Sequence, residues 1–186
     1  MKRECSNRPR QASDKELPPE NRLKINFDGA FKAETLTGSC GFIIRNSSGE
    51  AVTAGAANVS PVRDAMMAET LACKIALEAV EAHGISRVEL ETDSALLREA
   101  LATNARDLAP GGVLFKGIRE LLADQFRCDC VRNIPRSCNS VAHEIARLGM
   151  SWDPGQSVVW LDPLPEIVNI LVARDLAEQS SLDIRP

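Results

Sequence analysis

The sequence predicts an α/β fold, in which a mixed five-stranded sheet is flanked by helices. Two observations lead to this prediction. The first is a series of three strand patterns, separated by short turn-like segments, within residues 23–58. The second is the order of patterns after residue 60, which runs helix, strand, helix, helix, strand, helix. Such an order is typical of an antiparallel meander followed by parallel strands with crossover helices.

The first strand is predicted at residues 23–29, where apolar side chains alternate with Lys24, Asn26 and Asp28. This period of two is typical of a strand with one face in a core. Asp28 lies in an otherwise apolar strand and is followed at once by Gly29. A buried carboxylate must be paired, protonated or bound to a metal, because an isolated charge in a low dielectric is very costly. Asp28 is therefore the first candidate functional residue.

Two further strands are predicted at residues 38–46 and 51–58, and a long helix follows at residues 63–83. The helix begins close after a proline and is rich in Ala, Leu and Met, which favour helices. Its packing stripe runs from Met66 to Val80 and contains one acid, Glu69. An acid on a face that should pack against the sheet is the second candidate functional residue.

A fourth strand is predicted at residues 88–92, directly before Asp93 and Ser94. Ser94 can cap a helix that continues to about residue 103. Asp93 lies at the carboxyl end of a strand, where α/β sheets place ligand-handling groups, and is the third candidate. The remaining predictions are a helix at residues 113–125, a strand at 126–134, a helix at 138–150 and a short helical pattern at 165–178.

Composition divides the chain into three parts. Residues 1–21 are polar and contain three prolines, so they are predicted to form a disordered leader. Residues 22–150 hold all the predicted strands and form the folded domain. Residues 151–186 carry both tryptophans and four prolines, and we expect an appendage that packs on the domain or binds a protein partner.

Charge and cysteine content exclude several classes of protein. The domain has 15 basic and 16 acidic residues, so any contact with nucleic acid must be local or metal-mediated. No apolar run approaches the length of a membrane span, and no apolar stretch follows the basic N-terminus as in a secretory signal. We therefore expect an intracellular protein, nuclear or cytoplasmic and not secreted. The six irregularly spaced cysteines are interpreted as free thiols rather than as disulfides or a zinc site.

The three candidate acids allow two interpretations. In the first, each is satisfied separately: Asp93 beside a helix cap, Glu69 by Arg63, and Asp28 in a turn with Gly29. In the second, the order of elements brings the three carboxylates to one place, where each raises the pKa of the others. Divalent cations would relieve that repulsion, and Mg²⁺ prefers oxygen ligands while it retains several waters. Two such ions about 3.5–4 Å apart can support hydrolysis of a phosphodiester.

A resemblance to a known family rests on four segments that occur in order: I-N-F-D-G-A, A-E-T-L-A-C-K-I-A-L-E-A, L-E-T-D-S and N-S-V-A-H-E-I-A. Over residues 23–150 the sequence resembles the ribonuclease H type 1 domain, in particular the plant branch related to retrotransposon reverse-transcriptase proteins. The resemblance implies the ribonuclease H-like fold and a metal-dependent endoribonuclease that cuts the RNA strand of RNA–DNA hybrids. It also implies that Asp28, Glu69 and Asp93 bind two Mg²⁺ or Mn²⁺ ions.

The sequence departs from the family pattern at the fourth acid, which is replaced by His143. Imidazole can ligate a metal or shuttle a proton but brings no negative charge; alternatively, His143 is a half-buried histidine on the helix surface. The loop at residues 133–137 also lacks the histidine of cellular members. These departures keep a second hypothesis open, a catalytically weakened module that binds nucleic acid or a protein partner.

The remaining predictions concern the substrate. We expect His143 to assist the three acids in catalysis. The resemblance also suggests four substrate-binding residues: Gly29, Ser94, Arg136 and Asn139. Arg136 and Asn139 either face the substrate phosphate or cap the last helix of the domain. The expected partner is an RNA–DNA hybrid or another nucleic acid, read by its shape and its 2′-hydroxyls, and the protein is expected to be a monomer that binds no membrane.

Overall fold

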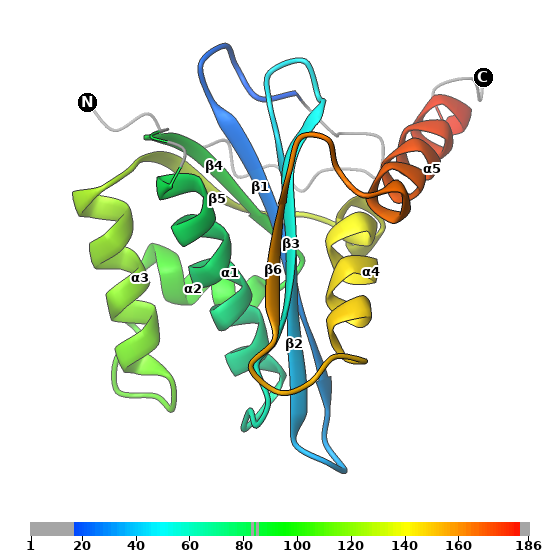
Figure 1. The fold of residues 1–186 in the computed structure, drawn as a ribbon. Helices are drawn as coiled ribbons and strands as arrows, with labels where there is room; N and C mark the ends of the chain where they lie inside the picture. The colour runs from blue at the N-terminus through cyan, green and yellow to red at the C-terminus, as the bar shows by residue number, and fades with distance from the viewer. Residues whose placement is uncertain (1–16, 83, 85, 183–186) are drawn as a thin grey trace.

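The computed structural model describes residues 17–82, 84 and 86–182, so most of the predicted leader lies outside the described residues. One sheet of six strands, in the order β5-β4-β1-β2-β3-β6, forms the centre of the molecule. Helices α1, α2 and α3 lie on one side of this sheet, and α4 and α5 lie on the other (Figure 1). The predicted α/β architecture is confirmed.

The first three strands form the predicted antiparallel meander. They are β1 (Leu23–Lys32), β2 (Thr37–Arg45) and β3 (Ala51–Asn58). β1 is the central partner of both halves of the sheet, since it pairs with β2 in antiparallel fashion and with β4 in parallel. Its alternating apolar side chains are buried, as the period-two pattern predicted, but the polar side chains of residues 24, 26 and 28 on the other face are buried as well.

The parallel part of the sheet consists of β4 (Arg87–Thr92) and β5 (Arg127–Asn133). In the register of β4 on β1, Asn26 lies opposite Glu91. Because strand residues two apart share a face, Asp28 and Asp93 are the next level on the same side of the sheet. The register therefore brings the end of β4 to the middle of β1.

The sheet contains a sixth strand that the sequence analysis did not predict. β6 (Ser157–Leu161) lies in the predicted appendage and pairs in antiparallel fashion with β3. Its sequence S-V-V-W-L has four consecutive apolar residues and no alternation, which is why the strand was not recognised. Trp160 of this strand makes an edge-to-face contact with Trp152, with ring centroids 6.1 Å apart. The C-terminal segment is thus continuous with the sheet.

Three helices cover the first face, and each lies close to its predicted range. They are α1 (Ala65–Glu81), α2 (Ala95–Ala102) and α3 (Gly112–Asp124). Their buried side chains join the apolar residues of β1, β2 and β4 in the larger of two hydrophobic cores. Asp64 caps α1, because its side chain accepts a hydrogen bond from the backbone N–H of Met67 at 2.8 Å.

The second face carries a short 3₁₀ turn, η1 (Arg136–Asn139), followed by α4 (Ser140–Gly149) and α5 (Glu166–Leu182). Here a smaller core joins β2 and β3 to the two helices, with Ile43, Ile145 and Val168 completely buried. α5 is longer than the helix predicted at residues 165–178. The smaller core covers only part of this face, and polar side chains occupy the rest of it.

The five cysteines in the described part of the chain are all free thiols, as predicted. Burial raises the pKa of the Cys40 and Cys73 thiols, so both are neutral core residues at physiological pH. Among the helices that the structure describes, none combines the length and the apolar character needed to cross a bilayer.

Candidate functional site

The candidate site lies where β1, α1, the end of β4 and the start of α4 meet. Asp28 is its most buried acid, with 6% of its surface exposed. Burial is the largest cause that raises the pKa of Asp28, and the neighbouring Asp93 carboxylate raises it further. The hydrogen bond from His143 acts in the opposite direction. The carboxyl group is therefore held in an environment that disfavours its negative charge.

Gly29 sets the distance between β1 and α1. A Cβ atom at this position would lie 2.3 Å from the backbone nitrogen of Glu69 and 2.4 Å from the carbonyl carbon of Ala68. Only a residue without a side chain allows the helix backbone to approach the strand so closely. Gly29 was predicted to contact substrate, and the structure gives it the packing role that brings Glu69 towards Asp28.

Glu69 projects from α1 into the same region and is half-buried. Burial is the largest cause that raises its pKa to about 7, while a hydrogen bond with the Ser94 side chain opposes the rise. The charges of Asp28 and Asp93 raise the pKa of Glu69 further, and that of Arg136 lowers it. The three predicted acids therefore act on one another electrostatically, and the interpretation in which each is satisfied separately does not describe this structure.

Ser94 has two contacts at the amino end of α2. Its side-chain oxygen accepts a hydrogen bond from the backbone N–H of Leu97 at 3.3 Å, which makes it the predicted cap. The same hydroxyl interacts with Glu69. Ser94 therefore connects the acid on α1 with the chain segment that carries Asp93.

Asn139 lies beneath the site. It is only 1% exposed, and its amide nitrogen donates to the backbone carbonyl of Phe27 at 2.9 Å and to Oδ1 of Asp93 at 3.2 Å. These bonds join the residue before Asp28 to the Asp93 carboxylate. Asn139 was predicted either to face substrate or to cap the helix; it is buried, and it makes no side-chain cap bond to α4. Its amide contacts the Asp93 carboxylate, and whether it also faces substrate stays a prediction.

His143 lies directly against the most buried acid. Its Nδ1 is 2.7 Å from Oδ2 of Asp28, and its side chain is 26% exposed. A terminal guanidinium nitrogen of the exposed residue Arg136 lies 3.5 Å from both ring nitrogens of His143. The predicted half-buried histidine is therefore observed, and it occupies one oxygen of Asp28.

The family resemblance implies divalent metal ions, and the donor chemistry of the site can be tested against them. The charge of Asp93 raises the pKa of Asp28, and the charges of both raise that of Glu69, so the three carboxylates form the oxygen-rich, electronegative set that Mg²⁺ or Mn²⁺ prefers. As they stand, however, the described residues contain no group of three or more His, Cys, Asp or Glu side chains placed to hold a metal ion. The carboxylate oxygens are the type of ligand that these ions prefer. The hydrogen bond between His143 and Asp28 would have to break before both Asp28 oxygens could bind metal.

The raised pKa of Glu69 predicts a pH dependence of stability. The folded state favours the protonated carboxyl, so stability is full below the ordinary pKa of 4.5 and decreases as pH rises towards about 7. The shift corresponds to roughly 3 kcal/mol. Urea denaturation between pH 4.5 and about 7 should show that the free energy of unfolding decreases more for the natural protein than for Glu69→Gln. The prediction would be wrong if the free energy of unfolding changed equally with pH in the two proteins.

A divalent ion should reverse this effect, because it favours the ionised carboxylates. We expect added Mn²⁺ to raise the free energy of unfolding near neutral pH and to flatten its pH dependence. The Glu69→Gln variant should respond less.

The sequence analysis missed a row of polar residues that continues the site along the sheet. The amide nitrogen of Asn26 donates to Oε2 of Glu91 at 2.9 Å, and Lys24 pairs with Oε1 of the same carboxylate at 3.1 Å. All three side chains are at least nine-tenths buried. The available signal was the alternation of polar positions on both strands, at residues 24, 26 and 28 and at 89, 91 and 93.

Comparison with known proteins identifies the group to which this arrangement is similar. The model of the reverse transcriptase-like family matches residues 26–149. No curated protein matches the chain. Among solved structures, ribonuclease H1 of the halophilic archaeon Halobacterium salinarum NRC-1 is 28% identical, with a TM-score of 0.61, and the match covers 69% of this chain and 96% of that one.

Two further solved structures share the fold at lower identity. One is LC11-RNase H1, which was isolated from compost by a metagenomic approach and was solved in complex with an RNA/DNA hybrid. The structure of this complex is 20% identical, with a TM-score of 0.63, and the match covers 69% of this chain and 96% of that one. The N-terminal RNase H domain of a Mycobacterium tuberculosis protein is 18% identical, with a TM-score of 0.62 and coverage of 69% and 93%. The predicted RNase H-like α/β fold is confirmed, whereas these matches do not extend to the plant branch.

Proposed function

This chain belongs to the reverse transcriptase-like family, and from that premise we propose that it is a metal-dependent endoribonuclease acting on the RNA strand of RNA–DNA hybrids. The observation that supports this proposal is the electrostatic coupling of Asp28, Glu69 and Asp93, three carboxylates contributed by separate elements. The similarity to a ribonuclease H1 bound to an RNA/DNA hybrid supports the choice of substrate.

In the proposed reaction, Asp28, Glu69 and Asp93 hold two Mg²⁺ or Mn²⁺ ions. When bound, such ions activate the attacking water and offset charge on the phosphoryl and leaving oxygens. Asn139 keeps the Asp93 carboxylate in place, and Ser94 orients Glu69. The exposed guanidinium of Arg136 stands at the edge of the site, where it can bind a substrate phosphate.

The test is cleavage of a labelled RNA–DNA hybrid in the presence of Mg²⁺ or Mn²⁺. We expect cuts in the RNA strand that leave 3′-hydroxyl and 5′-phosphate ends, and no cuts when a chelator is present. Cleavage that persists without divalent ions would rule out this mechanism.

A second candidate function is supported by His143. Its hydrogen bond to Asp28 and the lack of a preformed group of three ligands within the described residues suit a site with weakened metal binding. The chain would then be a module that binds nucleic acid or a protein partner without turnover. Hybrid binding that persists without any calorimetric signal for Mn²⁺ would favour this candidate, and turnover of the hybrid would exclude it.

Exchanging His143 for an acid should strengthen metal binding. In His143→Asp, a fourth carboxylate replaces the imidazole that now bonds Asp28, so the site gains negative charge and releases an oxygen donor. We expect the Mn²⁺ dissociation constant to fall roughly tenfold, or about 1.4 kcal/mol. Calorimetry on His143→Asn provides the control, since Asn removes the imidazole without adding charge. Equal affinities of the two variants would refute the charge argument.

A further inference from the structure

A buried carboxylate on α5 contacts two elements of the domain. Asp175 is 4% exposed. Its Oδ1 accepts a hydrogen bond from the Ser140 hydroxyl at 2.9 Å, and its Oδ2 accepts one from the Arg45 guanidinium at 3.1 Å. Ser140 is the first residue of α4, and Arg45 is the last residue of β2. One side chain of the C-terminal helix therefore connects the sheet with the start of the helix that carries His143.

The contact with Ser140 lies next to the candidate site in the sequence. The residue before Ser140 is Asn139, whose amide holds both Asp93 and the backbone carbonyl next to Asp28. Asn139 is the last residue of the 3₁₀ turn η1, and Ser140 is the first residue of α4, so the two residues lie at the junction of two helical segments. Any shift of Ser140 relative to β1 would move the Asn139 amide with it.

The contact with Arg45 leads to the same pair of strands. The Arg45 guanidinium donates to Oδ1 of Asn26 at 3.2 Å, and Asn26 in turn donates to Glu91. Asn26 lies two residues before Asp28 on β1, and Glu91 lies two residues before Asp93. Asp175 is thus linked to the chain segments that carry Asp28 and Asp93 by two series of contacts. One series passes through Ser140 and the other through Arg45.

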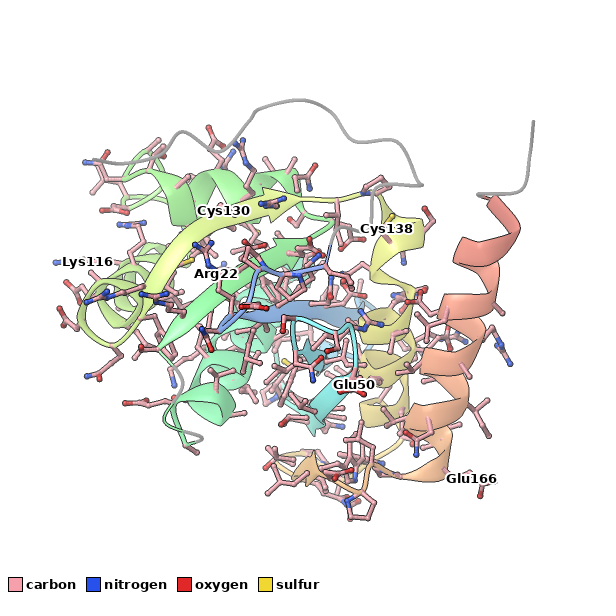
Figure 2. The ribbon with its side chains drawn as sticks, turned by 90° about the horizontal axis from the view of Figure 1, so that it is seen from above. Arg22, Glu50, Lys116, Cys130, Cys138 and Glu166 are labelled. Atoms are coloured by element: carbon pink, nitrogen blue, oxygen red, sulfur yellow. The ribbon has the colours of Figure 1, made fainter. Side chains whose placement is uncertain are left out.

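The network borders a cavity on one side. A cavity of about 500 Å³ is lined by Lys24, Asn26, Arg45, Glu91 and Asp175. Glu50 and Cys138, which line the same cavity, lie on the β2–β3 turn and in the 3₁₀ turn η1 (Figure 2). Because the polar side chains of the network face the cavity on one side, the hydrogen bonds among them contribute to their positions.

We propose that Asp175 is a positioning residue, through which α5 keeps the start of α4 and the strands β1 and β4 in the relative positions that the candidate site requires. The inference rests on the proposed function for its catalytic consequence. Removing the carboxylate leaves the Arg45 guanidinium buried without this partner and frees the Ser140 hydroxyl, and a buried charge that loses its partner rearranges its surroundings.

The test compares Asp175→Ala and Asp175→Asn in the full-length chain. Asn keeps an acceptor for Ser140 but removes the charge that pairs with Arg45, so its effect should be intermediate. For Asp175→Ala we expect kcat for hybrid cleavage to fall about tenfold while KM changes less than about twofold, because group placement rather than substrate binding is altered. The matched control is Glu166→Gln, an exposed acid at the start of the same helix, directed away from the other elements (Figure 2).

A second measurement separates this proposal from the proposed function. The side-chain amide protons of Asn139 are held by hydrogen bonds to Phe27 and Asp93, so their NMR signals report on the site without any turnover. They should shift in Asp175→Ala and remain unchanged in Glu166→Gln. If the natural protein cleaves no hybrid, the proposed function fails and the NMR shift still tests positioning. A lower unfolding temperature with unchanged Asn139 signals and unchanged kcat would overturn the inference.

Discussion

Replacing Asp28 with Asn should abolish cleavage of RNA–DNA hybrids while the protein remains folded. Asp28 is the acid nearest the centre of the site, and it interacts with Asp93, Glu69 and His143. The substitution removes the negative charge of the proposed metal ligand at this position. The carboxylates of Glu69 and Asp93 lie elsewhere and cannot take its place. We expect kcat to fall on the order of a thousandfold, which corresponds to about 4 kcal/mol of transition-state stabilisation. The measurement is single-turnover cleavage of a labelled hybrid in Mg²⁺ or Mn²⁺.

The stability of the same variant separates catalysis from folding. Burial raises the pKa of Asp28, so the folded state already disfavours its charge, and the neutral Asn should be tolerated. The unfolding temperature of Asp28→Asn is therefore expected to stay level or to rise. Asp124→Asn, the same exchange at an exposed position at the end of α3, should leave cleavage unchanged. Hybrid cleavage that survives in Asp28→Asn would remove the proposed mechanism.

Replacing Gly29 with Ala should be strongly destabilising. The new Cβ atom would lie 2.3 Å and 2.4 Å from backbone atoms of Glu69 and Ala68, and backbone cannot rotate away as a side chain can. α1 would have to move from the sheet and carry Glu69 away from Asp28. Overpacking of this kind costs up to about 3 kcal/mol. Urea denaturation should show a loss of this size in the free energy of unfolding, accompanied by weaker Mn²⁺ binding.

The control is the same exchange at Gly117, which lies within α3. A Cβ atom there would meet nothing within 4 Å. Because Ala is a better helix former than Gly, Gly117→Ala should stabilise the protein by up to about 1 kcal/mol. Two Gly-to-Ala exchanges in one protein are thus expected to have opposite signs. Similar effects at both positions would show that the close approach of α1 to β1 is not a steric requirement.

The fold was accessible from the sequence because its elements carry clear local patterns. Alternation predicted β1, and the helix-forming composition between Pro61 and Gly84 predicted α1, within a few residues of their observed bounds. β6 was missed because its consecutive apolar residues show no alternation, and the segment becomes a strand by pairing with β3.

The candidate acids could be selected from the sequence, but their relations could not. Asp28 lies among the polar positions of an otherwise apolar strand, Glu69 lies on an apolar helix stripe, and Asp93 follows the end of a strand, and all three positions can be recognised in the sequence. The bond between His143 and Asp28 joins residues 115 positions apart, and the bond between Asn139 and Asp93 joins residues 46 positions apart. No periodicity reports on contacts of that range. The close packing of Gly29 against α1 is equally invisible in the sequence, because it depends on where the helix docks.

Local patterns in the sequence specify most of the strands and helices, and they show which polar side chains must be placed in a mostly apolar sheet. These properties depend on short-range periodicity and on the cost of burying charge, both of which are encoded locally. Long-range packing brings the acids into one electrostatic environment and places His143 against an oxygen of Asp28. It also connects Asp175 of α5 to the start of α4 and the end of β2. Those relations depend on the register of β4 on β1 and on the docking of α4 and α5, which arise when distant segments pack together.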